Sequence, residues 1–184
     1  MAMKRPPMVV TWVDQSIGEV GTHKSIKDRF ETLSAFISQW LYFNSSDDFT
    51  TYVEKNPNVK IISVMSGGMS RLLVPRLSYH ACLESVYVFC ADRNRAREAL
   101  EGEAKVKGIF TIEDDLYEQM MNDLSRLLLE DGVALAKIDE RNEAKLNYEE
   151  AKRLLNALQD ISIDEDEKKT RIEEINARID QLLA

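Results

Sequence analysis

The sequence predicts an α/β protein with a parallel sheet of five strands, helices on both faces of that sheet, and a helical C-terminal region. Two observations predict the sheet. Short apolar, β-branched runs alternate with helix-like segments five times over about the first 110 residues, and the runs are continuously apolar, as in strands buried on both faces. A third observation predicts the helical region: residues 112–184 contain no proline and only one glycine.

Four strands follow from apolar composition and flanking turn residues. They are expected at Met8–Val13, Val59–Met65, Ser85–Cys90 and Val106–Phe110. The remaining strand, second in chain order, is expected to be brief and to span Leu41–Phe43.

Helices are expected between the strands. From Ser25 to Trp40 apolar residues recur at helical spacing, so the first helix is expected to fill that segment. The later ones are expected after the N-cap candidates Ser46–Asp48, over Met69–Leu77, over Arg93–Leu100 and from Ile112 onward. The glycine-containing segment 16–22 is expected to be a loop. Right-handed crossovers then favour a doubly wound, flavodoxin-like sheet with strand order 2-1-3-4-5.

The C-terminal region is expected to form an antiparallel helical hairpin. A break or a kink is predicted near Gly132, and the predicted domains are residues 1–131 and 132–184. The turn at 160–163 would begin its last helix with a capping box of Ser162 and Glu165. Heptad spacing of the last helix at Ile172, Ile175, Ile179 and Leu182 is typical of a coiled coil. Narrow apolar stripes would need a third surface from the domain, a second copy or further native chain.

Charge is divided unevenly along the chain. Its net charge is −8, with 14 basic and 12 acidic side chains in residues 1–111 but 10 and 20 in residues 112–184. An acidic chain without a basic cluster makes nucleic acid an unexpected partner. Apolar runs are far shorter than the roughly 20 residues that span a bilayer, so no membrane association is expected.

A cytoplasmic location is expected, because no secretion signal follows the basic N-terminus. Cys82 and Cys90 are expected to be buried thiols, Cys90 inside a strand. The chain ends at Ala184 within a heptad helix, which suggests a fragment of a longer protein.

Ligands of open parallel sheets bind at the carboxyl ends of the strands, where this sequence places Asp14, Ser66–Gly68, Asp92 and Thr111. Response-regulator phosphoryl transfer would need an aspartate in place of Ser66, a hydroxyl in place of Asp92 and a lysine in place of Thr111. Three of its four roles are therefore missing, and phospho-acceptance is not expected.

The segment Ser66-Gly67-Gly68, with Arg71 after it, is a candidate anion site. Glycines between a strand and a helix expose backbone N–H groups, and an arginine adds charge. The alternative is that the glycines only permit a tight turn, since neither dinucleotide-binding nor P-loop spacing is present.

Enzymatic alternatives lack their required residues. Ser66 precedes its glycines, so the G-x-S-x-G pattern is absent, and neither His23 nor His80 is spaced to serve as its base. An NAD-cleaving TIR-type enzyme would need a glutamate in the helix beside the cleft, but residues 70–80 contain no acid. No catalytic residue, metal ligand or cofactor is therefore assigned.

Several segments together resemble a known family. They are Val10–Asp14, the Ser66-Gly67 turn followed by Leu73–Arg76, Val86–Cys90, and Lys105–Thr111 with Asp115-Leu116. The sequence resembles, over about residues 8–120, receiver-like N-terminal domains that precede arginine-specific ADP-ribosyltransferase or tetratricopeptide modules in multidomain invertebrate proteins. That resemblance implies a regulatory or interaction role. The chain contains neither of those modules, so no transferase activity is carried over.

The function expected from the sequence is a non-catalytic interaction or oligomerisation module of a multidomain signalling protein, associating with a protein partner or with itself through its C-terminal helices. The alternative is a nucleotide or small-anion sensor, or a weak NAD-related enzyme, using Asp14, Ser66, Gly67, Gly68, Arg71 and Asp92.

Overall fold

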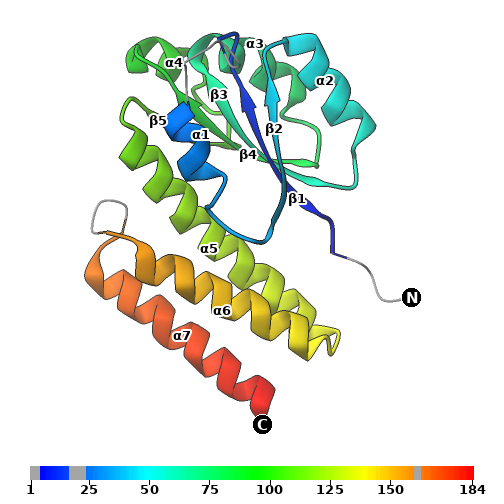
Figure 1. The fold of residues 1–184 in the computed structure, drawn as a ribbon, viewed down its shortest axis with the longest axis vertical. Coiled ribbons are helices and arrows are strands. Elements are labelled where there is room, and N and C mark those ends of the chain that lie inside the picture. Colours follow the sequence, from blue (N-terminus) through cyan, green and yellow to red (C-terminus); the bar gives the residue numbers. More distant parts are fainter. Residues whose placement is uncertain (1–4, 17–23, 160–162) are drawn as a thin grey trace. The chain divides into compact units, whose positions relative to one another are not determined.

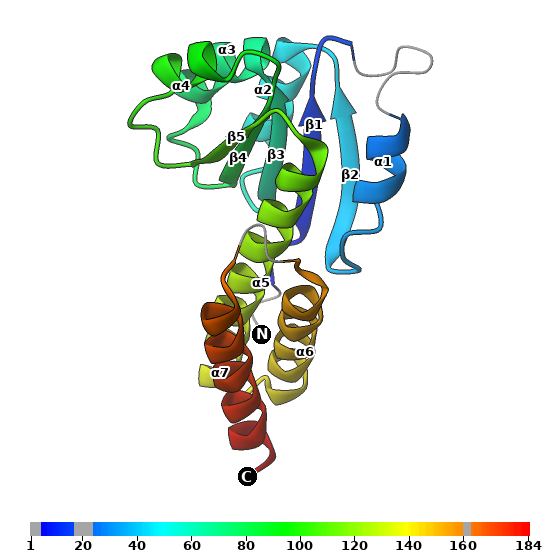
Figure 2. The ribbon, with the colours of Figure 1, turned by 90° about the vertical axis from the view of Figure 1, so that its left-hand side faces the viewer.

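The computed structural model describes residues 5–16, 24–159 and 163–184. Its strands are β1 (Met8–Val13), β2 (Ile37–Phe43), β3 (Lys60–Ser66), β4 (Leu83–Phe89) and β5 (Val106–Phe110). They form one parallel sheet in the order β2-β1-β3-β4-β5 (Figure 2). The predicted fold class, a doubly wound α/β sheet followed by C-terminal helices, is confirmed.

Seven helices accompany the strands in the described part of the chain (Figure 1). They are α1 (Lys24–Phe30), α2 (Ser46–Lys55), α3 (Gly67–Leu77), α4 (Arg93–Ala99), α5 (Glu113–Lys137), α6 (Arg141–Ala157) and α7 (Glu165–Leu183). The chain divides into two compact units, residues 1–116 and 117–184, so the division falls within α5. The boundary expected after Asp131 stays a prediction, as does the loop at 17–22, which lies outside the described residues.

The second strand is longer than expected and the first helix is shorter. The helix predicted to run from Ser25 to Trp40 is wrong beyond Phe30, because residues 37–40 form the first half of β2. Their apolar spacing fits a helix, but in the structure Trp40 packs edge-on against Phe30, with ring centroids 6.3 Å apart. The backbone of residues 37–43 pairs with β1, and this pairing overrides the local helical pattern.

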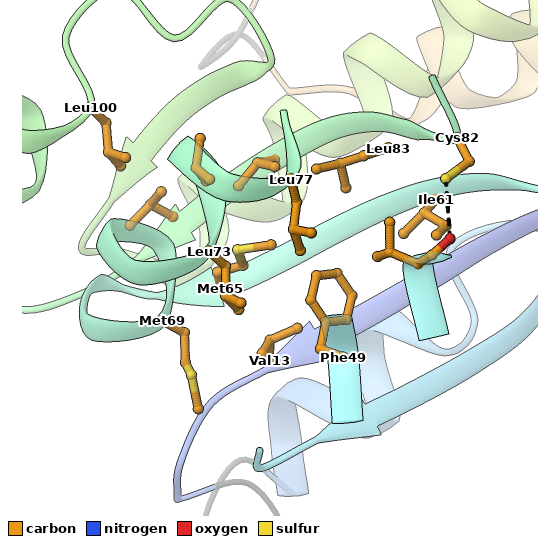
Figure 3. Packing of buried hydrophobic residues seen from close by; sticks show 14 of the residues in the cluster. Val13, Phe49, Ile61, Met65, Met69, Leu73, Leu77, Cys82, Leu83 and Leu100 are labelled. Carbon is orange, nitrogen blue, oxygen red and sulfur yellow. Dashed lines mark hydrogen bonds between the residues drawn. The ribbon is translucent and has the colours of Figure 1, made fainter. Parts of the chain in front are cut away.

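Each face of the sheet has its own apolar packing. On one face, Phe49 of α2 and Leu73 and Leu77 of α3 pack with Val13 and Met65 of the strands (Figure 3). On the other face, the ring of Trp12 in β1 meets that of Phe30 in α1 edge-on, with centroids 5.7 Å apart. Helices therefore pack against both faces of the sheet.

The second unit is a bundle of α5 from Tyr117 onward, α6 and α7. Hydrogen bonds pair α6 with α7 in antiparallel order: Lys152 donates to Asn176, and Lys168 near the start of α7 donates to the Leu158 carbonyl oxygen that follows α6. The predicted hairpin is therefore present. Its third surface is α5, because Arg171 of α7 is buried and donates to both Asn122 and Ser125.

Two details of these helices differ from the sequence prediction. The break lies at 138–140, where Asp139 has a φ of 63°, and α5 continues through Gly132. The predicted cap, Ser162, is not among the described residues, and Asp164 caps α7 by accepting a hydrogen bond from the Glu167 backbone N–H at 2.8 Å.

Candidate functional site

The predicted site residues lie at the carboxyl ends of the three central strands. Asp14 follows β1, Ser66 ends β3 and Asp92 follows β4, and the sheet order places these strands side by side. The register sets Val13 opposite Met65 and Ser66 opposite Phe89. The topology therefore brings these positions to one edge, as the sequence predicted.

Asp14 forms a turn at the end of β1. One of its carboxylate oxygens, Oδ1, accepts hydrogen bonds from the backbone N–H and the hydroxyl of Ser16, both at 3.0 Å. Its own backbone N–H donates to the Phe43 carbonyl oxygen at 3.0 Å. This is the Asx-turn geometry in which an aspartate side chain satisfies nearby backbone groups.

Ser66 and Asp92 cap the two helices that leave this edge. The Ser66 hydroxyl accepts a hydrogen bond from the Met69 backbone N–H at 3.3 Å at the start of α3. The Asp92 carboxylate accepts one from the Arg95 backbone N–H at 3.1 Å at the start of α4. Both side chains thus satisfy N–H groups that a helix start leaves unpaired.

The glycines differ in their surroundings. A Cβ on the buried Gly67 would lie 3.1 Å from the Cβ of Cys90 and 3.4 Å from Nη1 of Arg71, so this position permits a close approach of α3 to the residue after β4. Gly68 is exposed, and a Cβ there would meet nothing within 4 Å. The turn interpretation accounts for Gly67, while Gly68 has room for a side chain.

Cys90 lies at these strand ends but was not among the candidate site residues that the sequence indicated. It was expected inside a strand, but it follows β4 and is half-buried, whereas Cys82 is buried; both thiols are free. The one sequence feature that could have indicated Cys90 is its position: it directly follows Phe89, which lies opposite Ser66 in the sheet.

The environment of Cys90 opposes ionisation of its thiol. Burial raises the pKa of the thiol and the Asp92 carboxylate adds to the rise, while Arg71 and Arg93 act in the opposite direction. A thiol with a raised pKa is mostly protonated at neutral pH and is therefore a poor nucleophile. Arg71, Cys90 and Asp92 form a small polar cluster beside Gly67, without an activated nucleophile.

Two other kinds of site find no support in the described residues. No group of three or more histidine, cysteine, aspartate or glutamate side chains there is arranged to hold a metal ion. None of the helices described is long and apolar enough to cross a membrane.

The fold and its strand ends define a flavodoxin-like α/β protein whose strand-end carboxylates and hydroxyl serve turns and helix caps. Comparison of the chain with protein-family models, curated proteins and solved structures finds no match.

Proposed function

We propose that this chain is a non-catalytic, receiver-like interaction module of an intracellular multidomain signalling protein. The observation that supports it is the use of Asp14, Ser66 and Asp92 by local backbone groups. A catalytic carboxylate or hydroxyl must instead reach a reacting group and be activated for it. The module acts through its surfaces, on a protein partner or on a second copy of itself.

The helical unit offers one such surface. Among the described residues of this unit, the exposed large apolar side chains are Ile138, Leu146 and Leu183, with Leu183 70% exposed. Because α5 already supplies the third surface of the bundle, a partner is not required to complete its core. Association through these helices would instead use the apolar side chains that remain outside.

A thermal-shift screen of the full chain with ATP, NAD, ADP-ribose and inorganic phosphate tests the non-catalytic proposal. We expect no stabilisation by any of them. A ligand that binds the folded state stabilises it by about 2.7 kcal/mol at 100 times its dissociation constant, so even weak binders are detectable at high concentration.

The second candidate is an anion or nucleotide sensor, which the exposed Gly68 and the nearby Arg71 favour. Stabilisation by one of these compounds that Arg71→Ala abolishes would overturn the interaction module in favour of this sensor. Arg76→Ala is the matched control, because Arg76 is an exposed arginine further along α3, and its shift should equal that of the unaltered chain.

A further inference from the structure

The strand β2 forms one edge of the sheet, and apart from a bulge near its start it lacks the features that usually protect an edge. Its seven residues contain no charged side chain and no proline. Edge strands of natural proteins are commonly short, or carry lysine or proline, because their free backbone groups pair readily with another strand. The opposite edge strand, β5, is shorter and contains Lys107 and Gly108, so the two edges differ in protection.

The backbone groups that face outward from β2 can be assigned. The Phe43 carbonyl oxygen accepts a hydrogen bond from Asp14 beyond β1, at 3.0 Å, so the backbone groups of Phe43 face β1. Backbone direction alternates along a strand, and therefore the N–H and C=O groups of Trp40 and Tyr42 face the other way. No strand of the described residues pairs with that edge.

The side chains of the last residues of β2, in contrast to its edge, pack against the neighbouring helices. The Trp40 ring packs against Phe30 of α1, and the Tyr42 hydroxyl donates to Glu31 just after that helix. On the other face the ring centroid of Phe43 lies 5.4 Å from that of Phe49 in α2. The surface that remains is a row of backbone donors and acceptors, which another strand complements.

We propose that β2 pairs in antiparallel fashion with β2 of a second copy of this chain, about a two-fold axis at Leu41. This names the partner and surface of the proposed interaction module and rests on that function. Trp40 would face Tyr42 of the second copy in a hydrogen-bonded pair. By symmetry, Tyr42 would face Trp40 of the second copy in another such pair. Each such pair exchanges two backbone hydrogen bonds, giving about four in total, and the edges would merge into one continuous sheet.

The side chains of β2 suit pairing with themselves. The two-fold axis sets Trp40 beside Tyr42 of the second copy on the α1 face, twice, and aromatic cross-strand pairs are stabilising. Leu41 meets its own copy on the other face. A charged strand that pairs with its own copy brings like charges close together. This repulsion is absent in β2, because none of its side chains is charged. The same operation centred on Lys107 in β5 would place two lysines together.

The rest of the unit supports the same occupant. Residues 1–116 contain 14 basic and 15 acidic side chains, so two copies of this unit repel each other little. A bulge at Ser38 interrupts the register with β1, which leaves the regular segment Gln39–Phe43 for pairing.

Sedimentation equilibrium of the full chain tests the pairing with two matched variants. Leu41→Lys sets two lysines opposite each other at the symmetry axis, and we expect it to raise the dimer dissociation constant at least about tenfold, the effect of about 1.4 kcal/mol. The control is Leu146→Lys, the same change at an exposed leucine of α6, which should leave the dimer intact. A wild-type chain that stays monomeric, or a dimer lost only in Leu146→Lys, overturns the proposal.

Hydrogen exchange on the unaltered chain provides a test that does not depend on the folding of a variant. The backbone amides of Trp40 and Tyr42 should become protected as protein concentration rises, while the amide of Leu41, which faces β1, should not change. If the protection of the Trp40 and Tyr42 amides does not change with protein concentration, edge pairing is overturned. Ligand binding in the thermal-shift screen would overturn the proposed function, whereas an unpaired β2 edge would overturn only this inference. The two failures are therefore distinguishable.

Discussion

The chemistry of Cys90, at the carboxyl ends of the strands, depends on its neighbours. Burial and the Asp92 carboxylate raise the pKa of its thiol, and Arg71 and Arg93 lower it. Asp92 also caps α4 through its side chain. Asparagine caps helices about as well as aspartate, so Asp92→Asn removes the charge while keeping the cap.

We predict that Asp92→Asn lowers the pKa of the Cys90 thiol and speeds its alkylation by iodoacetamide near neutral pH, because loss of a nearby negative charge favours the thiolate. Arg71→Gln should raise the pKa and slow the reaction. Mass spectrometry of the Cys90 peptide across a pH series measures both rates, with Cys82, which is buried, as an internal reference. Equal rates in the three proteins would show that these charges do not act on the thiol.

Within α5, Gly132 makes a close helix–helix approach possible. A Cβ at this position would lie 2.5 Å from Cε1 and 2.7 Å from Cδ1 of the Tyr148 ring in α6. Glycine normally weakens a helix interior by about 1 kcal/mol relative to alanine. The sequence pattern therefore suggested a break there, yet the residue is used to let the buried Tyr148 ring lie against α5.

We predict that Gly132→Ala destabilises the helical unit by about 1–3 kcal/mol, since overpacking by one methyl group outweighs the gain in helix propensity. Gly68→Ala is the matched control, because a Cβ there meets nothing within 4 Å, and it should be neutral or stabilising by up to about 1 kcal/mol. Urea unfolding followed by circular dichroism measures both. A stabilised Gly132→Ala protein would contradict the close packing of Tyr148.

Across the whole chain, the distribution of charge distinguishes two modes of association, pairing through β2 and association through the C-terminal helices. The sheet unit has a net charge of −1, whereas residues 117–184 carry 10 basic and 17 acidic side chains. Two helical units would therefore repel each other at low ionic strength, and salt would relieve that repulsion.

We predict that the dimer dissociation constant changes less than about twofold between about 0.1 M and about 1 M sodium chloride, over which the screening length falls from about 10 Å to about 3 Å. Pairing through β2 brings together uncharged strands of the nearly neutral unit. Sedimentation equilibrium at the two salt concentrations measures it. Marked strengthening by salt would point to association through the acidic helices instead.

Local patterns in the sequence determined the sheet, the helical C-terminal region and the positions of the strand-end residues. Met8–Val13 and Val106–Phe110 were predicted with their observed bounds, the first because an apolar β-branched run favours a buried strand. Crossover handedness then leaves few strand orders, and this makes the common edge of Asp14, Ser66 and Asp92 predictable. The candidate residues could be located, but not their hydrogen-bond partners.

Only the tertiary structure decided features that depend on contacts between distant residues. Residues 37–40 have helical spacing, and pairing with β1 makes them a strand. Gly132 has a low helix propensity, and the Tyr148 ring makes it a packing position. In both cases a long-range contact outweighs a local preference of about 1 kcal/mol per residue, and such contacts are not encoded by periodicity.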